Sequence, residues 1–551
     1  MSDDKPGTQP DQSVLANLIA ARASEEKDLP LLTFVSVGPD NQLLEQTRSY
    51  RQLHDNGQQL AAGLLAAGME KGDSFALVMQ NHPEFVDAMV ASSICGTVFV
   101  PIDPRTRGDK LAYMLTFPEC RGAIVADYAL ACVLAVLPQV PGLEWLWVVS
   151  SGAPADYPEE QAIPLRALST LPPVSEAPPV AVIDPLEPMQ MLFTSGTTGD
   201  PKAIVASYTR FDNVSSIGPL LGLVETDILY TGLSLTHANA QLITLGNALK
   251  MGLPCVISRK FTKSRLWDIC RRYGCTFFNL LGGMTTAIYS EPPRPDDADN
   301  PVRRVLSAGM PAVIWDDFAR RFNVEIFEFY GAAEGGMTFN PPGAGPVGSI
   351  GKPPPTLEAV VVDENDNPCP PHVQGEIIFR NADHSTPVVA YYKNPEASRK
   401  KTRDGWLRMG DIGHTDEDGW FYYDYRIGGG LRHNGDFINP GFVEKAIAEH
   451  PQVDDVFVFG TDAASGVPGE KDVIAAVVPL AGTTLEAAQI YRHCREHLES
   501  NSVPSYIQVM KEIPKTASEK PQERFCLEFF RNHPEAVYTE TQSKTQRGAS
   551  V

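Results

Sequence analysis

Short apolar runs alternate with helix-like segments through most of this 551-residue chain, and this alternation constrains the fold more than any other feature. The runs at 75–79 (FALVM), 97–100 (TVFV) and 145–149 (WLWVV) have the length and composition of buried strands. Segments such as 53–68 (LHDNGQQLAAGLLAAG) and 109–115 carry apolar residues at helical spacing. Strands that alternate with helices predict βαβ units and a mostly parallel sheet, so we expect an α/β protein.

The pattern also divides the chain, which is too long for one ordinary domain. Residues 151–179 are rich in Pro, Ala and Ser and predict a linker between two α/β lobes. From 348 to 425 strands and tight turns predict a small, β-barrel-like sheet. Three glycines at 428–430 can absorb large backbone rotations. We therefore expect a large N-terminal domain of two α/β lobes plus the small sheet (1–427), a smaller mobile α+β C-terminal domain (428–538) and a flexible tail (539–551).

Charge and cysteine usage narrow the class of protein. Lys and Arg number 46 against 68 Asp and Glu, a net charge of −22, and such a surface repels phosphate backbones and anionic lipid. A nucleic-acid partner is therefore not expected, whereas a local positive pocket for a small anion is still compatible with this charge. The nine cysteines are scattered, the first residues lack a signal-peptide pattern, and no apolar stretch has the length of a membrane span. These features predict a cytoplasmic protein and leave its oligomeric state open.

The strongest local signal is the segment 191–203 (MLFTSGTTGDPKA), in which an apolar strand runs into a loop of glycines and hydroxyl residues. Small residues leave backbone N–H groups free to face phosphate oxygens, and a lysine adds charge. A solvated turn is the alternative, but such turns are rarely this dense directly after a strand. The loop is not a Walker A motif, because GxxxxGK[ST] is absent. The predicted phosphate-binding residues are Thr194, Ser195, Gly196, Thr197, Thr198, Gly199 and Lys202.

This loop resembles that of the adenylate-forming superfamily of acyl-CoA synthetases, adenylation domains and firefly-type luciferases. The family reads [ST]SGTTGxPKG, and this chain departs from it only at Ala203. Further family motifs follow in the family's order, so the resemblance covers roughly residues 45 to 530. In overall pattern, including NPEAS and VPSYIQV, the chain resembles the crotonobetaine/carnitine-CoA ligase branch.

The resemblance implies a nucleotide site. The segment 307–311 (SAGMP) matches the loop that packs against adenine, and 330–334 (YGAAE) stands where the family has YGxTE. Ala333 replaces the family's threonine, so one phosphate-contacting hydroxyl is missing. The roles implied are adenine or phosphate contacts for Ala308, Gly309, Met310, Tyr330 and Gly331, Mg²⁺ binding for Glu334, and ribose and nucleotide contacts for Asp411 and Arg426.

The resemblance also implies a moving catalytic lysine. The segment 513–520 (IPKTASEK) matches PKTxSGK, whose last lysine reaches the α-phosphate and the acid, a role that falls to Lys520. Glu519 takes the place of the family's glycine. Gly428 and Gly429 replace the family's Lys-Asp, so Gly429 is the expected hinge, and the CoA-contacting loop falls on His433, Asn434 and Gly435.

The acid pocket is the part that the motifs specify least. His237, in LSLTHANAQ, occupies a position where the family often has histidine or an aromatic residue, although a lone histidine is more often structural. The other acid-pocket residues implied are all small, namely Gly282, Gly283, Ala332 and Gly335. Unless backbone closes in, they predict a wide, mainly apolar pocket for a bulky or ring-bearing acid.

Together these features predict an AMP-forming acid–CoA ligase that uses ATP, Mg²⁺ and CoA, with Lys520, Glu334 and Lys202 as catalytic residues and a small-molecule carboxylic acid as substrate. Two alternatives stay open. One is an adenylating enzyme with another acceptor, such as a carrier-protein thiol. The other is a nucleotide-binding relative with weakened catalysis, suggested by Ala333, Gly428 and Glu519.

Overall fold

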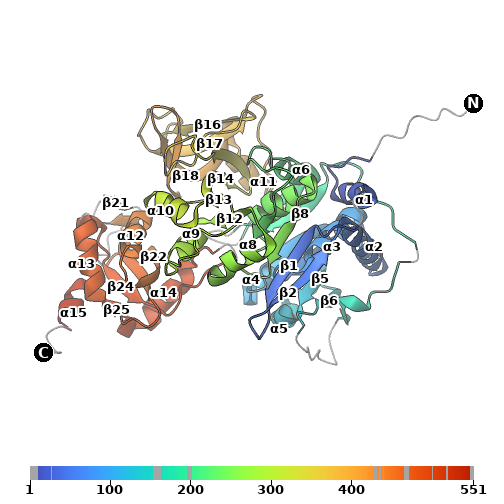
Figure 1. Cartoon of the computed structure of the whole chain (residues 1–551), viewed down its shortest axis with the longest axis horizontal. Coiled ribbons are helices and arrows are strands. Elements are labelled where there is room, and N and C mark those ends of the chain that lie inside the picture. Colours follow the sequence, from blue (N-terminus) through green and yellow to red (C-terminus); the bar gives the residue numbers. More distant parts are fainter. Residues whose placement is uncertain are drawn as a thin grey trace, which may run out of the picture.

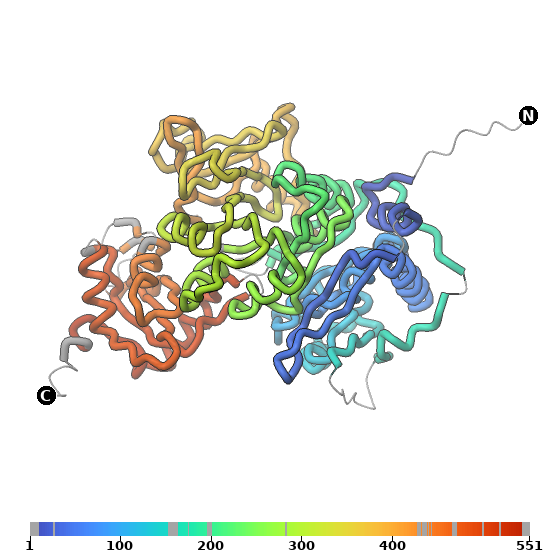
Figure 2. Tube along the Cα trace, in the orientation of Figure 1, coloured from blue at the N-terminus to red at the C-terminus, as the bar shows by residue number. Residues whose placement is uncertain are grey.

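The structure is a computed structural model that describes residues 10–25, 28–152, 163–174, 176–194, 201–426, 431–433, 436–438, 440–464, 471–498, 500–516 and 519–545. Figure 1 shows the N-terminal elements at one end, the C-terminal elements at the other, and a small sheet above the middle. The tube view in Figure 2 shows the same arrangement along the Cα trace.

The first lobe is built on a seven-stranded sheet in the order β7-β6-β5-β3-β4-β8-β9, parallel except for the last pair. Its strands are β3 (Ser74–Val78), β4 (Val98–Ile102), β5 (Cys120–Ala126), β6 (Trp145–Val149), β7 (Leu165–Ala167), β8 (Pro188–Phe193) and β9 (Ala203–Ser207). Every residue of β3, β4 and β6 is buried, as expected for a parallel sheet covered on both faces. Along β3, Phe75 and Leu77 enter one core while Ala76 and Val78 enter another.

Helices on the two faces explain this alternation. One face is covered by α1 (Leu15–Glu25), α2 (Tyr50–Ala66) and α3 (Pro83–Cys95), and the other by α4 (Gly108–Thr116) and α5 (Asp127–Val136). Helix α2 begins at Ser49 in a capping box, in which Ser49 and Gln52 each accept the other's backbone N–H.

The second lobe contains an eight-stranded sheet in the order β15-β14-β13-β12-β10-β11-β1-β2. The strands are β1 (Leu32–Val37), β2 (Leu43–Arg48), β10 (Leu229–Thr231), β11 (Cys255–Ser258), β12 (Phe277–Leu281), β13 (Arg304–Ala308), β14 (Glu325–Ala332) and β15 (Gly335–Asn340). Its helices are α6 (Tyr208–Ser215), the π-helix η3 (Asn239–Leu245), α7 (Gly246–Met251), α8 (Leu266–Tyr273), α9 (Gly282–Tyr289) and α10 (Ala312–Phe322). One apolar core contains Phe75 of the first sheet and Phe277 of the second, so the two lobes are packed together.

The predicted strand-and-turn region forms a four-stranded antiparallel sheet, β16 (Leu357–Val362), β17 (Gly375–Asn381), β18 (Leu407–Thr415) and β19 (Phe421–Arg426), with α11 (Pro395–Lys401) beside it. Among the described residues β16 and β19 are the two edges and do not pair with each other. The predicted small sheet is therefore present, and over the residues described it is not closed by pairing of its two end strands.

The C-terminal part has a mixed sheet of β22 (Val453–Asp462), β23 (Lys471–Pro479), β24 (Tyr506–Val509) and β25 (Val537–Tyr538), and a hairpin of β20 (Leu431–His433) and β21 (Asp436–Ile438). Its helices are α12 (Pro440–Ala448), α13 (Ala487–His497), α14 (Glu523–Asn532) and α15 (Glu540–Thr545). Alternate residues of β23 enter two separate cores, one shared with α12 and α13 and the other with α14. Helix α15 lies in the segment expected to be a flexible tail, and Glu540 forms an ion pair with Arg495. In the described part of the chain, no helix has the length and apolar character needed to cross a membrane.

Candidate active site

A cavity of about 3480 Å³ is lined by both large lobes, the four-stranded sheet and the C-terminal part. Strands β12, β13 and β14 are parallel, so their carboxyl ends meet at one edge of the sheet, where Leu281, Ala308 and Tyr330 line the cavity. Ligands of open α/β sheets bind at such edges. The cavity is larger than a typical small-molecule pocket, which holds a few hundred to about 1000 Å³. It has room for more than one substrate.

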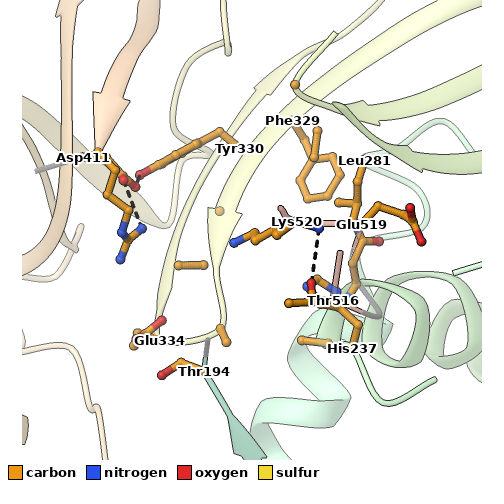
Figure 3. Close-up of a pocket in the computed structure, with 18 of the residues that line it drawn as sticks. Thr194, His237, Leu281, Phe329, Tyr330, Glu334, Asp411, Thr516, Glu519 and Lys520 are labelled. Carbon is orange, nitrogen blue, oxygen red and sulfur yellow. Dashed lines mark hydrogen bonds and ion pairs between the residues drawn. The ribbon is translucent and has the colours of Figure 1, made fainter. Parts of the chain in front are cut away.

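Asp411 lies at the centre of a polar contact between two sheets. The Tyr330 hydroxyl on β14 donates a hydrogen bond of 2.5 Å to Asp411 Oδ2 on β18. Arg426 stands opposite Asp411 in the β18–β19 ladder, and its Nη1 lies 3.0 Å from Asp411 Oδ1. Asp411 is 3% exposed, and burial together with this carboxylate raises the pKa of Tyr330. The tyrosine is therefore a neutral donor, and the carboxylate is held from two directions (Figure 3).

Lys520 reaches the same cavity from the C-terminal part. Its loop is closed by hydrogen bonds from Thr516 N–H to the Lys520 carbonyl (2.8 Å) and from Lys520 N–H to Thr516 Oγ1 (3.2 Å). Glu519 adopts φ = 58°, a left-handed conformation that favours glycine, which explains why a glycine suits this position in the family. Figure 3 shows the Lys520 ammonium between Tyr330 and Glu334, with His237 on the other side. Burial and Arg426 lower the pKa of Lys520, while Asp411 and Glu334 oppose this shift.

Glu334 lies in the turn between β14 and β15. Its carboxylate accepts a hydrogen bond of 2.7 Å from the Tyr391 hydroxyl, and its backbone carbonyl accepts one of 3.3 Å from Arg210 Nη1. The Lys202 ammonium lies 5.3 Å from the centre of the Tyr391 ring. The predicted metal ligand and the phosphate-loop lysine thus share one tyrosine.

The backbone of the predicted adenine loop, 307–311, is hydrogen-bonded to a buried carboxyl group. Glu328 Oε1 accepts the Gly309 N–H at 2.5 Å, and its Oε2 accepts the Met310 N–H at 3.1 Å. Gly309 has φ = 105°, which a residue with a side chain rarely adopts. Glu328 is 2% exposed, and burial raises its pKa to about 8.

His237 lines the cavity just before the π-helix η3, a rare element that is frequent at functional sites. Its Nδ1 accepts the Asn239 N–H at 3.2 Å, so the ring proton of the neutral form is on Nε2. Burial and the Lys520 charge lower its pKa to about 4. Near neutral pH the ring is therefore an uncharged N–H donor facing the region of Lys520 (Figure 3).

The remaining predicted site residues lie in several places. Thr194, Gly331, Ala332 and Gly335 line the cavity, and Gly282 and Gly283 form the first turn of α9 next to Leu281. His433 is buried on β20 with its Nδ1 2.6 Å from the Lys471 carbonyl, and it does not line the cavity. Outside the described residues lie Ser195, Gly196, Thr197, Thr198, Gly199, Gly429, Asn434 and Gly435.

Sequence reasoning missed three side chains that hold the site. Arg210, Glu328 and Tyr391 contact, respectively, the Ala333–Glu334 backbone, the adenine loop and the Glu334 carboxylate. Glu328 was detectable as a charged residue inside an otherwise apolar and aromatic strand (IFEFY). Arg210 and Tyr391 stand in segments without such a contrast, and only folding brings them to Glu334.

Known proteins match this chain in sequence over most of its length. A family model described as AMP-binding enzyme matches residues 20–386, and one described as AMP-binding enzyme C-terminal domain matches residues 443–520. The crotonobetaine/carnitine–CoA ligase of Salmonella typhimurium is 27% identical over 484 residues, covering 86% of this chain and 91% of that protein. The sulfoacetate–CoA ligase of Cupriavidus necator is 28% identical over 524 residues, covering 92% and 96%.

Two solved structures share the architecture. The anthranilate CoA ligase AuaEII in complex with anthranoyl-AMP has a TM-score of 0.78 at 23% identity and covers 95% of this chain and 98% of its own. A benzoate CoA ligase from Burkholderia xenovorans LB400 has a TM-score of 0.77 at 22% identity, covering 93% and 99%. The predicted α/β fold with a large N-terminal and a smaller C-terminal part is confirmed.

Proposed function

This chain belongs to the AMP-binding enzyme family, and on that premise we propose that it is an ATP-dependent acid–CoA ligase. It activates a carboxylic acid as acyl-AMP with release of pyrophosphate, and then transfers the acyl group to the CoA thiol. Similarity to the two curated CoA ligases over most of the chain supports this assignment.

The observation that carries the proposal is the position of Lys520 in the cavity, beside Glu334 and the Tyr330–Asp411 pair. In the first half-reaction an oxygen of the acid attacks the α-phosphorus of ATP, and pyrophosphate leaves with the bond electrons. Both reactants are anions, so a cation held between them stabilises the charge that develops in the transition state. Lys520 is suited to this task, and Asp411 and Tyr330 to orienting the nucleotide.

Magnesium fits this site through Glu334. The described residues contain no cluster of three or more potential metal-ligating side chains, but Mg²⁺ on nucleotides usually takes one or two carboxylates, with phosphate oxygens and water completing its shell. When bound, the ion neutralises phosphate charge. Tyr391 supports the assignment, because its hydrogen bond holds the Glu334 carboxylate at the cavity.

The acid is placed beside His237. The neighbouring lining includes four apolar side chains, Leu242, Ile243, Leu281 and Phe329, which can hold the acyl body by burial. A neutral Nε2–H of His237 adds one hydrogen-bond donor without a competing cation. These residues support a bulky or ring-bearing acid, in line with the anthranilate and benzoate ligases of the same fold.

The C-terminal domain (428–538) is proposed to move between half-reactions, as the glycines at 428–430 suggest. Lys520 lines the cavity while His433, expected at the CoA site, lies outside it, an arrangement suited to adenylation. The proposed linker, 151–179, contains β7 of the seven-stranded sheet, and the proposed tail, 539–551, contains α15. A cytoplasmic location is supported by the nine cysteines, all of which are free thiols.

A pyrophosphate-release assay with a panel of acids tests the proposal, followed by measurement of the thioester after CoA is added. Pyrophosphate release that depends on the acid, together with acyl-CoA formation, is the expected result. Release without a CoA thioester points to another acceptor, such as a carrier-protein thiol. No release with any acid points to a nucleotide-binding relative and contradicts the proposal.

A further inference from the structure

Arg210, on α6, is bound to the backbone on both sides of Glu334. Its Nη2 donates to the carbonyl of Ala333, and its Nη1 donates to the carbonyl of Glu334 at 3.3 Å. Helix α6 is capped by Ser207, the last residue of β9, and β9 begins directly after Lys202. The first turn of α6 therefore lies close in sequence to the phosphate loop and is hydrogen-bonded through Arg210 to the turn that carries Glu334.

These two contacts fix more than the two carbonyl groups. The Ala333 carbonyl belongs to the peptide plane before the Glu334 Cα, and the Glu334 carbonyl belongs to the plane after it. Since a trans peptide is planar, holding both carbonyls on one side fixes φ and ψ of Glu334. The direction of its Cα–Cβ bond is then determined, and the Tyr391 hydroxyl holds the carboxylate at the other end.

Desolvation of the Arg210 guanidinium at this position costs free energy of folding. Arg210 is half-buried, and burial lowers its pKa, while Glu334 is the carboxylate that opposes the shift. Its Nε is buried, with no hydrogen-bond partner among the described residues. A desolvated cation with an unsatisfied donor destabilises the folded state unless its remaining hydrogen bonds and ion contacts offset the cost.

We propose that Arg210 is a positioning residue that aims the Glu334 carboxylate at the metal–phosphate site. The inference rests on the proposed function, because it takes Glu334 as the Mg²⁺ ligand. It predicts that Arg210 acts in adenylation, where Mg²⁺ is needed, and has little effect on thioester formation from preformed acyl-AMP.

The test compares wild type with Arg210→Met, Arg210→Lys and a matched control, Arg304→Lys. Arg304 also donates to two consecutive carbonyls, through Nη1 alone, to Leu221 at 3.1 Å and Gly222 at 3.3 Å, but it does not line the cavity. The readouts are ATP affinity by calorimetry with and without Mg²⁺, the Mg²⁺ dependence of adenylation, and the rate of thioester formation from acyl-AMP.

In Arg210→Met the gain in ATP affinity caused by Mg²⁺ should fall, and half-saturating Mg²⁺ for adenylation should rise, each by roughly tenfold, about the effect of one charge-assisted hydrogen bond. Thioester formation should change by less than about threefold, a small free-energy change. Arg210→Lys, which keeps the charge but lacks the planar fork that binds each carbonyl through its own nitrogen, should show the same defect in weaker form and decides the case if the methionine variant does not fold.

The proposal is overturned if both half-reactions fall equally, if the Mg²⁺ dependence is unchanged, or if Arg304→Lys reproduces the defect. The calorimetric measurement distinguishes failure of the Arg210 proposal from failure of the proposed ligase function. A wild type that binds ATP with Mg²⁺ but activates no acid refutes the ligase proposal. The effect of Arg210 on Mg²⁺-dependent ATP binding can still be measured in that case and tests the Arg210 proposal.

Discussion

The hydroxyl of Tyr330 and the carboxylate of Asp411, 81 residues apart in the sequence, are joined by a hydrogen bond of 2.5 Å. Tyr330 belongs to the eight-stranded sheet and Asp411 to the four-stranded one. The bond therefore connects the proposed adenine side of the site to the proposed ribose side, and Arg426 completes the contact through the second carboxylate oxygen.

Asp411→Ala should weaken ATP binding, because charge-assisted hydrogen bonds to the ribose are lost, a change of roughly 1.5–3 kcal/mol. Calorimetry measures the affinity. Tyr330→Phe is the control, since it removes the bond between the sheets and leaves the carboxylate in place. An ATP affinity that is unchanged in Asp411→Ala would exclude Asp411 from the nucleotide site.

Lys520→Ala should cripple formation of acyl-AMP and leave thioester formation from preformed acyl-AMP much less affected, because the ammonium acts only while two anions react. Single-turnover assays of each half-reaction measure the difference. Lys511→Ala, an exposed lysine of the same segment that does not line the cavity, should match wild type. Equal loss in both half-reactions of a folded Lys520→Ala protein would refute the assigned role.

His237 should contribute a stability that is lost in acid. Its folded pKa is about 4, whereas an unfolded histidine titrates near 6.5, so the unfolded chain binds the extra proton between these values. Stability should fall as pH decreases through this window, by at most about 1.4 kcal/mol per pH unit. Thermal unfolding of wild type and His237→Gln across the window measures it. Parallel curves for the two proteins would contradict a lowered pKa of His237.

Glu328 should show the opposite dependence. Its folded pKa of about 8 lies above the ordinary value of 4.5, so the folded state retains a proton that the unfolded state has released. Its contribution is complete below about pH 4.5 and is lost as the pH rises toward 8. The unfolding temperature of wild type relative to Glu328→Gln should therefore decrease over this range. Glu325→Gln, exposed on the same strand, is the control. A difference that does not vary with pH would contradict this prediction.

The acid pocket should prefer a bulky or ring-bearing acid over acetate or propionate, since burial of the acyl body supplies most of the discrimination. A panel of acids compared by kcat/KM decides the matter. A clear preference for two- or three-carbon acids would show that the apolar lining near Leu281 and Phe329 does not receive the acyl chain.

Local sequence was enough to predict the α/β class and the motifs. Runs such as 75–79 and 145–149 form buried strands, because consecutive apolar residues must be covered on both faces of a sheet. The length and composition of these runs are visible in the local sequence. The small sheet was also predicted, but whether its end strands pair depends on tertiary packing, and no local pattern encodes that.

The sequence by itself thus determined which elements form and which residues carry phosphate, metal and acid chemistry in the proposed site. Tertiary structure decided which side chains hold them in place. Arg210, Glu328 and Tyr391 gain their roles only where separate chain segments meet, across 19 positions for Glu328 and Gly309, 57 for Tyr391 and Glu334, and 123 for Arg210 and Ala333. Hydrogen bonds act over about 3 Å, so such contacts depend on the packing of whole sheets rather than on the spacing of residues along the chain.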